Sequence, residues 1–262
     1  MQNIIKALNY QVKRDIVTYI AIIVGALTAI IPIVDSDVGS LAELNGGLYS
    51  KTYLGIMFIM SYILACVIVA CITGKDMGDK TINYEVMSGH SRAEVYFSRV
   101  VVSLVWDIGI VIVISLLPMI IFTAINGWGN NIVFTELVPH YLINIGAALR
   151  MNCFVLMITS IMRHPVAGGF IAYGIIDVSL VPIMILQDLL DIELPHFLAM
   201  SDVFYLSELS NMRVIIEGGE KIAKYDMRVD NSYAIWSVVI AVVVSAVYLF
   251  LGYFAFKKRD MR

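Results

Sequence analysis

The sequence predicts an all-α polytopic membrane protein with six transmembrane helices. Hydrophobic residues make up 60% of the 262-residue chain and charged residues only 15%, whereas soluble domains are roughly 45–50% apolar and about 25% charged. The mean hydropathy is +0.84. Six apolar runs each approach the roughly 20 residues that a helix needs to cross the hydrocarbon core. We therefore expect a single transmembrane domain over residues 1–262, with no segment long enough for a soluble catalytic domain.

The first fifteen residues are expected to form an amphipathic helix that lies in the membrane interface. Apolar side chains recur at helical spacing along one face, namely Ile4, Ile5, Leu8, Val12 and Ile16. Polar and cationic side chains occupy the other side, where they would meet lipid headgroups. A frayed N-terminus is the alternative. This segment is too polar to be the apolar region of a cleavable signal peptide.

The six apolar runs place the spans at about 16–34, 54–73, 100–123, 139–162, 166–187 and 233–256. The fourth run is interrupted by Asn144, Arg150 and Asn152. Only the turn Arg163-His164-Pro165 separates it from the fifth run, so these two helices should pack antiparallel. Pro165 suits the first turn of the fifth helix, where its missing N–H does no harm.

The distribution of Lys and Arg predicts that both termini are cytoplasmic, because cytoplasmic connections carry an excess of these residues. The inner side then holds Lys6, Lys13, Arg14, Lys75, Lys80, Arg92, Arg99, Arg163, Lys257, Lys258, Arg259 and Arg262. The outer side holds only Lys51, Arg213, Lys221, Lys224 and Arg228. The expected location is the plasma membrane, with the bilayer as the immediate partner.

The longest outer connection covers residues 188–232. Its first half is amphipathic and rich in Leu and Phe, which favours a pair of helices lying in or dipping into the outer leaflet. Its second half, EGGEKIAKYDMRVDNSY, is polar and rich in turn residues.

No set of residues in the sequence predicts a catalytic or metal centre. The four His residues, at positions 90, 140, 164 and 196, lie far apart, and the three Cys residues lie inside apolar runs. The pattern Gly-x4-Gly-Lys-[Ser/Thr] is absent, so the chain has no P-loop with which to bind ATP. The net charge of -3 and the lack of a basic block give no indication of nucleic-acid binding.

Three ionisable residues interrupt the apolar runs: Asp107, Arg150 and Asp177. Charges at membrane depth are costly, and they pair with one another or face the interior of the bundle. At 1.5 Å per residue, Arg150 and Asp177 each lie roughly 18–20 Å from the inner boundary, and Asp107 about 12 Å. We therefore predict an Arg150–Asp177 ion pair, which is either a structural clamp between two helices or part of a polar translocation path.

The segment on which the functional interpretation depends is the charged inner connection, residues 74–99. Asp76 or Asp79 can cap a short helix from about 80 to 88. Ile82 and Val86 then lie one turn apart on one face of this helix, with Tyr84 and Met87 alongside.

The same segment carries signals that end one helix and begin the next. Gly89 suits the position just after a helix C-terminus. Ser91-Arg92-Ala93-Glu94 matches a capping box, in which the Ser and Glu side chains each bond to the other residue's backbone. A new helix should therefore begin at Arg92 and continue into the third span. The result would be a short cytoplasmic helix that is rigidly connected to a transmembrane helix.

With these features the chain resembles the permease subunits of type-2 ABC exporters. The inner connection reads Gly78-Asp79-Lys80-Thr81-Ile82 and then Ser88-Gly89-His90-Ser91-Arg92, and the sixth span ends Phe256-Lys257-Lys258-Arg259-Asp260. In that family the connection usually contains an acidic residue, Gly-Thr, a short helix and then Ser-Arg before the third span. Here Asp79-Lys80 interrupts the Gly-Thr pair. The resemblance covers essentially the whole chain, and topology contributes as much to it as the short motifs do.

The resemblance implies a non-catalytic subunit that binds no cofactor of its own. Two permeases would form a dimer, either of identical chains or with a similar second chain, together with two copies of an ATP-binding subunit that holds ATP and Mg. An N-terminal elbow helix would lie in the inner leaflet. The coupling helix would contact the ATPase through Asp79, Lys80, Thr81, Ile82, Tyr84, Glu85, Val86, Met87 and Gly89, with Ser91, Arg92 and Glu94 fixing the helix that follows.

The pattern of the inner connection is similar to that of small bacterial permeases that export amphipathic peptides, such as toxins, bacteriocins or antimicrobial peptides. Small-molecule antibiotics and lipid-like compounds are alternative substrates. A membrane enzyme would need a convergent set of residues that the isolated Asp107 and Asp177 do not supply, and a membrane sensor or assembly factor is the remaining alternative. Co-purification with an ATP-binding subunit would distinguish these classes.

Overall fold

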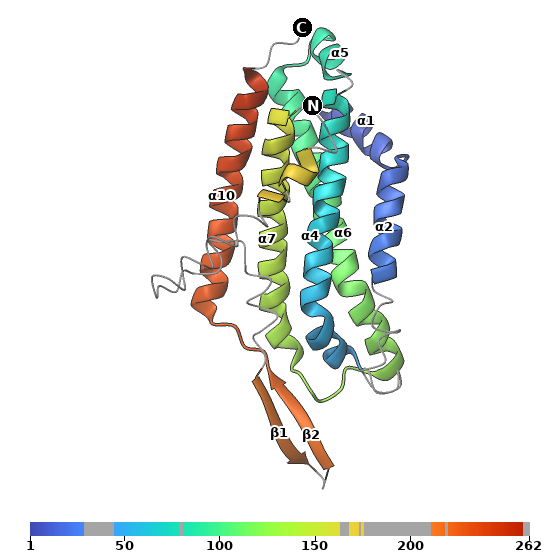
Figure 1. The fold of residues 1–262 in the computed structure, drawn as a ribbon, viewed down its shortest axis with the longest axis vertical. Coiled ribbons are helices and arrows are strands. Elements are labelled where there is room, and N and C mark those ends of the chain that lie inside the picture. Colours follow the sequence, from blue (N-terminus) through green and yellow to red (C-terminus); the bar gives the residue numbers. More distant parts are fainter. Residues whose placement is uncertain are drawn as a thin grey trace.

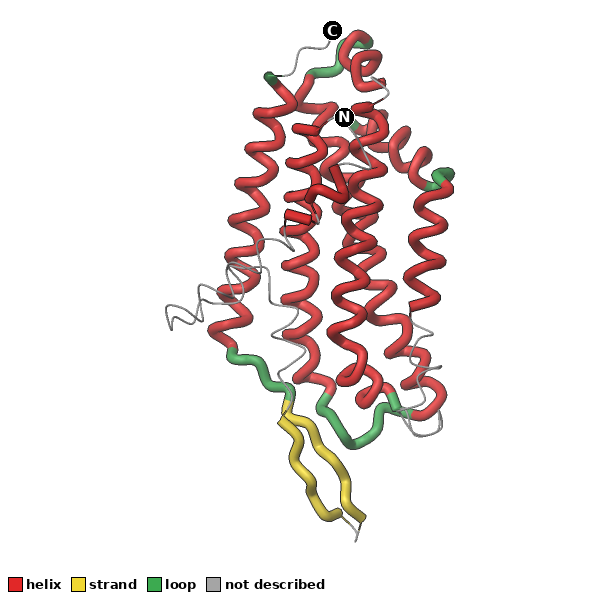
Figure 2. Tube along the Cα trace, in the orientation of Figure 1, coloured by secondary structure: helices red, strands yellow, loops and turns green. Residues whose placement is uncertain are grey.

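The computed structural model describes residues 1–28, 45–78, 81–162, 168–172, 174–175, 211–217 and 220–258. Long helices run side by side, and a β-hairpin extends from one end of the bundle (Figures 1 and 2). The elements are α1 (Gln2–Val12), α2 (Ile16–Thr28), α4 (Gly46–Gly78), α5 (Thr81–Met87), α6 (Arg92–Asn126), α7 (Phe134–Met162), β1 (Asn211–Glu217), β2 (Glu220–Asp226) and α10 (Asn231–Lys257). Residues 168–172 and 174–175 are also helical.

Three of the described helices, α6, α7 and α10, are long and apolar enough to cross a membrane. They contain the third, fourth and sixth predicted spans. The longest, α6, has 35 residues and therefore extends over about 52 Å at 1.5 Å per residue, well beyond the roughly 30 Å hydrocarbon core. Its ends must project into polar surroundings. The fold thus has the helical, apolar character of a membrane protein.

The helix of the second predicted span begins earlier than the sequence indicated, at Gly46 instead of near residue 54. Its first backbone N–H groups, which have no partner inside a helix, donate to groups outside it. Gly46 and Gly47 donate to the carbonyl oxygens of Gly127 and Trp128, each at 3.0 Å. The Asn45 side chain accepts from the Leu48 N–H at 2.9 Å. The apolar run in the sequence starts later than α4, because the first two turns of this helix contain several small or polar residues.

The predicted first span is described only as α2, and its residues 29–34 lie outside the described part of the chain. A break at residues 13–15 separates α1 from α2, and Asp15 caps α2 by accepting from the Val17 N–H at 3.1 Å. Of the fifth predicted span, 166–187, only the helical residues 168–172 and 174–175 are described.

The hairpin corrects the all-α prediction. β1 and β2 pair antiparallel, with Glu217 opposite Glu220. β2 lies in the segment that was predicted to be polar and rich in turn residues, and no element was predicted for β1. The residues between the strands are Gly218-Gly219, a pair typical of two-residue hairpin loops, and β1 carries the β-branched run Val214-Ile215-Ile216. Turn and strand preferences therefore prevail over helix formation here. The helix pair predicted for about 188–210 lies outside the described residues.

The direction of each helix is clear in Figure 1. The start of α1, the helix α5 and the end of α10 lie at one end of the bundle, and the hairpin lies at the other. α7 ends at the α5 end, whereas α10 begins at the hairpin end. The main core joins α4, α6 and α7 through fully buried side chains that include Ile68, Val69, Val95, Val155 and Leu156.

Candidate functional site

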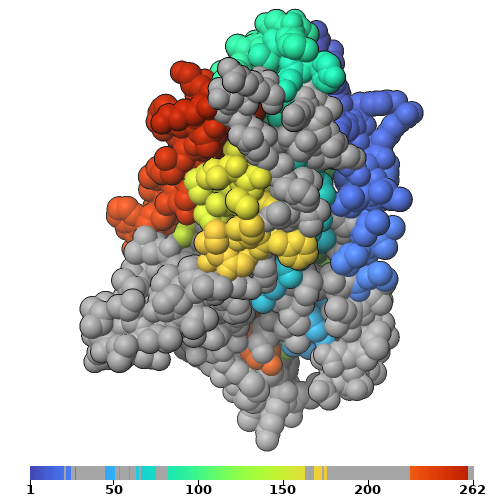
Figure 3. Space-filling model, turned by 45° about the horizontal axis from the view of Figure 1, so that its top comes forward, coloured from blue at the N-terminus to red at the C-terminus, as the bar shows by residue number. Residues whose placement is uncertain are grey.

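The candidate site is the α5–α6 corner, residues 81–99, which projects from the end of the bundle opposite the hairpin (Figures 1 and 3). Its short helix α5 is amphipathic. Ile82 is buried in the main core, and Val86 packs against the same core. Tyr84 and Met87 point outward with exposed fractions of 70% and 73%. The Ile82/Val86 face thus attaches α5 to the bundle, and the Tyr84/Met87 face is left for contact with another molecule.

The end of α5 is fixed by a glycine in a left-handed conformation. Gly89 has φ +98°, in a region that residues with a Cβ enter only at a cost. The N–H of Gly89 donates to the Val86 carbonyl at 3.1 Å, and the N–H of His90 donates to the Glu85 carbonyl at 3.3 Å. These two bonds form a Schellman motif, as the sequence predicted from Gly89. The turn between α5 and α6 is therefore a defined one.

The predicted capping box at the start of α6 is confirmed. The Glu94 N–H donates to the Ser91 Oγ at 3.2 Å, and the Ser91 N–H donates to the Glu94 Oε2 at 3.1 Å. Glu94 lies in the first turn, before the apolar part of α6. The hydrogen bond from the Ser91 backbone lowers the pKa of the Glu94 carboxyl, and the positive N-terminus lowers it further. The charged carboxylate thus strengthens the cap.

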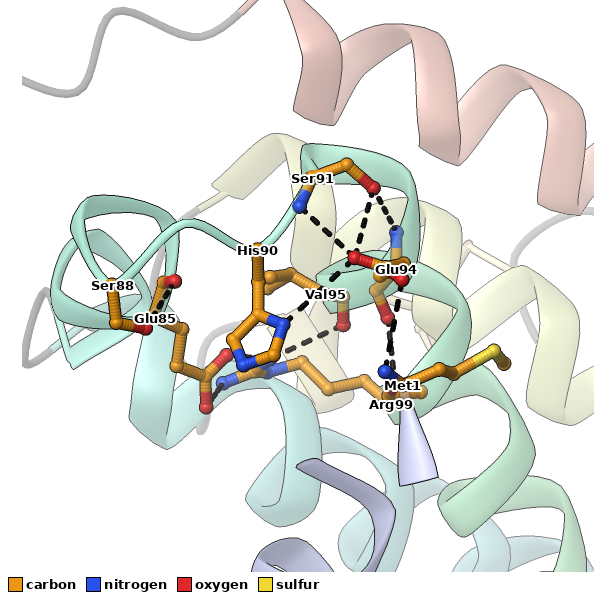
Figure 4. Close-up of polar contacts among 9 residues, drawn as sticks. Met1, Glu85, Ser88, His90, Ser91, Glu94, Val95 and Arg99 are labelled. Carbon is orange, nitrogen blue, oxygen red and sulfur yellow. Dashed lines mark hydrogen bonds and ion pairs between the residues drawn. The ribbon is translucent and has the colours of Figure 1, made fainter. Parts of the chain in front are cut away.

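The Glu94 carboxylate also lies close to the Met1 amino group and to the His90 ring (Figure 4). The Met1 amino group lies 3.7 Å from Glu94 Oε1, and His90 Nδ1 lies 3.8 Å from Glu94 Oε2. Because these groups are well exposed, each contact contributes little energy. Their effect is geometric: they bring the start of α1, the α5–α6 turn and the start of α6 to one point.

A buried ion pair, which the sequence analysis did not identify, connects α5 to α6. The Arg99 guanidinium, only 1% exposed, donates to the two carboxylate oxygens of Glu85 at 2.7 and 3.2 Å (Figure 4). It also donates to the Val95 carbonyl at 3.2 Å. The two-pronged geometry is the strong form of an Arg–carboxylate contact. The pair fixes the orientation of α5 relative to α6.

The corner is also connected to α10. The Arg92 guanidinium donates to the Lys257 carbonyl, in the last turn of α10, at 2.6 Å. One turn further along α6, the Tyr96 hydroxyl donates to the Leu249 carbonyl at 3.1 Å, and its ring packs against Tyr253 and Phe256. A displacement of α5 would therefore be transmitted to both α6 and α10.

The amphipathic helix α1 packs against α6. Its buried residues are Ile4, Leu8 and Val12, and the Trp106 indole N–H donates to the Asn9 Oδ1 at 2.9 Å. The predicted apolar face is confirmed for these three positions, but it is covered by protein. Ile16, which was assigned to the same face, belongs to α2 and is exposed.

The three intramembrane charges are only partly described. Asp107 is fully buried on α6, beside the Asn152 amide of α7, and within the described chain neither carboxylate oxygen accepts a hydrogen bond. Arg150 is buried on α7. Asp177 lies outside the described residues, so the Arg150–Asp177 pair stays a prediction.

Other predicted contact residues are described in part. Asp79 and Lys80 lie outside the described residues, and Thr81 begins α5. Glu85 has a structural partner in Arg99, which the sequence analysis counted only as a cation of the inner side. The signal that could have identified the pair is the coincidence of an acidic residue on a short helix with a single Arg two turns inside the next helix.

At the opposite end, Glu136 of α7 holds the exit of the hairpin. Its carboxylate accepts from the Met227 N–H at 3.2 Å and from the Arg228 Nε at 3.0 Å. This hydrogen bond raises the pKa of the Arg228 guanidinium. The pairing of Glu136 with Arg228 was not predicted from the sequence.

Within the described ranges, no group of three or more His, Cys, Asp or Glu residues could hold a metal ion. No known protein family, curated protein or solved structure matches the chain. The α5–α6 corner and the sequence are therefore the basis for proposing a function.

Proposed function

We propose that the chain is the membrane-spanning permease subunit of an ATP-driven exporter of the type-2 ABC class. The observation that carries this proposal is the α5–α6 corner. A seven-residue helix presents an exposed aromatic and an exposed Met to the outside, and it is joined to an apolar helix of 35 residues by a Schellman turn, a capping box and a buried ion pair. Such a unit transmits a push from a bound partner into the membrane.

The order of the elements supports a six-span topology. α2 and α6 run from the α5 end toward the hairpin end, whereas α4, α7 and α10 run in the opposite direction (Figure 1). One further crossing between α7 and α10, in the direction of α2 and α6, would bring the number of spans to six. An even number of spans agrees with cytoplasmic positions for both termini. The excess of Lys and Arg on the α5 side favours the cytoplasm for that end. In this topology α1 is the elbow helix and α5 the coupling helix, in the plasma membrane.

The energy for transport would come from another chain. The sequence contains no P-loop pattern, so ATP and Mg are assigned to a separate ATP-binding subunit, two copies of which would serve two permeases. Tyr84 and Met87 are the residues proposed to enter a groove on that subunit. Aromatic residues and Met are enriched in the cores of protein interfaces.

The proposed substrates are amphipathic peptides, on the basis of the resemblance of residues 78–92 to small bacterial peptide exporters. Asp107 and Asn152 are buried between the apolar helices α6 and α7, which is compatible with a substrate that has one apolar and one polar face. A direct check is the ATPase rate of the purified complex in nanodiscs, which an amphipathic peptide should stimulate and a polar peptide of the same length should not.

Site-specific photo-crosslinking tests the proposed partner. A benzoylphenylalanine is introduced in place of Tyr84, and membranes of the native host are irradiated. The control carries the same group in place of Phe134, an aromatic residue of similar exposure at the hairpin end. We expect position 84 to yield a product whose second chain contains Gly-x4-Gly-Lys-[Ser/Thr], and position 134 to yield none. The proposal fails if position 84 gives no such product, or if both positions give it equally.

A further inference from the structure

A long apolar groove lies on the surface of the bundle between α2 and α6. Its volume is about 460 Å³, and apart from Asn9 and the indole N–H of Trp106 the described residues that line it are apolar. The α6 side is formed by residues at helical spacing, which include Trp106, Gly109, Val113 and Leu117, and Ile22 closes the α2 side.

The dimensions of the groove match one leaflet of a bilayer. The lining residues of α6 extend from Val105 to Pro118, a length of about 20 Å at 1.5 Å per residue. One leaflet is about 15 Å thick in its hydrocarbon part and about 20–22 Å thick when its headgroup region is included. The groove is also open along its length, because Val105 and Val113 are exposed, and a Cβ added to Gly109 would meet no atom within 4 Å. A single extended hydrocarbon chain fits this shape.

One end of the groove is polar and cationic. Asn9 of α1 lines this end and accepts a hydrogen bond from Trp106 at 2.9 Å. Lys6 and Lys13 lie three residues before and four residues after Asn9, so the three share one side of α1. Both lysines are exposed. At the other end of the groove, Leu117 and Pro118 line it, and none of the described lining residues there is charged.

We propose that the α2–α6 groove binds one acyl chain of an anionic phospholipid, with the headgroup at Lys6 and Lys13. Two observations support this assignment: the slot is apolar and has the length of one leaflet, and two cations lie at one end of it. A second copy of this chain would have to cover the same slot with an apolar helix and would leave the two lysines without an anion. The bound lipid connects α1 to α2 and α6, which is a role distinct from that of the α5 surface.

Tryptophan quenching by brominated lipids tests this site. The full chain carrying Trp128→Phe and Trp236→Phe, which leaves Trp106 as the only one of the three tryptophans, is reconstituted in phosphatidylcholine vesicles. A small fraction of brominated phosphatidylglycerol or brominated phosphatidylcholine is added, and the quenching of Trp106 is compared. Each lysine near a membrane surface favours an anionic lipid by about fivefold. We expect brominated phosphatidylglycerol to quench more strongly, and Lys6→Gln or Lys13→Gln each to reduce this selectivity about fivefold.

Groove filling supplies the second measurement. Gly109→Leu should lower the quenching by both lipids, whereas Val242→Leu, at an exposed position of α10, should leave it unchanged. Equal quenching of the parent protein by the two lipids would overturn the proposal, because it describes an unselective lipid shell. Absence of quenching would overturn it as well, because a second copy or another segment would then cover the groove. If Gly109→Leu loses helicity by circular dichroism, the two lysine variants decide the outcome.

Discussion

The ion pair between Glu85 and Arg99 gives the sharpest test of how α5 is held. Glu85→Gln keeps the size of the side chain and removes its charge. The Arg99 guanidinium, 1% exposed, then loses its two-pronged bond to a carboxylate that is itself 28% exposed. It retains the bond to the Val95 carbonyl.

The expected cost follows from the burial of the two partners. A hydrogen bond to a charged group contributes roughly 1.5–3 kcal/mol, and the partial exposure of Glu85 moves the value of the pair toward the lower end. We therefore expect α5 to open more easily by about 2 kcal/mol. A change of this size corresponds to roughly a 30-fold increase in the population of the open state.

Hydrogen exchange of the α5 amides in nanodiscs measures this population directly. Exchange of the amides of residues 85–88, which bond to carbonyl groups of α5, should accelerate by about 30-fold in Glu85→Gln, while the amides of α7 remain unchanged. The matched control is Glu136→Gln, which breaks the ion pair with Arg228 at the opposite end. It should leave exchange in α5 as in the parent protein. If Glu85→Gln leaves α5 protection intact, the ion pair does not hold the helix and the proposed rigid connection is wrong.

Three further predictions concern stability in detergent, followed by thermal unfolding. Glu94→Gln should lower the midpoint temperature at neutral pH and not at acidic pH. Because the pKa of Glu94 is lowered in the folded protein, its carboxylate stabilises the fold above its ordinary pKa, and this contribution is lost as the pH falls through the lowered value. An equal loss at both pH values would contradict the cap. Gly252→Ala should cost about 1–3 kcal/mol, because its Cβ would lie 2.5 Å from the Tyr96 hydroxyl, whereas Gly109→Ala, which faces open space, should not. Asp107→Asn should be neutral or stabilising by about 1 kcal/mol, because Asp107 is fully buried and burial penalises a charged carboxylate more than an uncharged amide. A clear loss of stability would mean that the charge itself is required.

The elements that the sequence predicted well are those whose signals are local. Apolar runs located α6, α7 and α10, since a span depends on composition over about 20 residues. Gly89 and the Ser91/Glu94 pair predicted the end of α5 and the start of α6, since both motifs involve only neighbouring residues.

The features that the sequence did not reveal depend on contacts between distant segments. The start of α4 at Gly46 relies on carbonyl groups at residues 127 and 128, which no local pattern contains. The orientation of α5 depends on the core that covers Ile82 and on Arg99, so spacing alone could not tell the attached face from the exposed one. The hairpin was missed because neither strand shows the strict apolar/polar alternation that marks a half-buried sheet; β1, for example, has three consecutive apolar residues, Val214-Ile215-Ile216.

The most direct test of the central claim is the affinity of the ATP-binding subunit for this chain in nanodiscs. A central interface residue typically costs about 2 kcal/mol or more when truncated, which is roughly 30-fold in affinity. Tyr84→Ala together with Met87→Ala should therefore weaken binding by about 30-fold or more and reduce transport-coupled ATP hydrolysis, while Phe134→Ala changes neither. Unchanged affinity in the double variant would contradict the assignment of α5 as the surface that receives the ATPase.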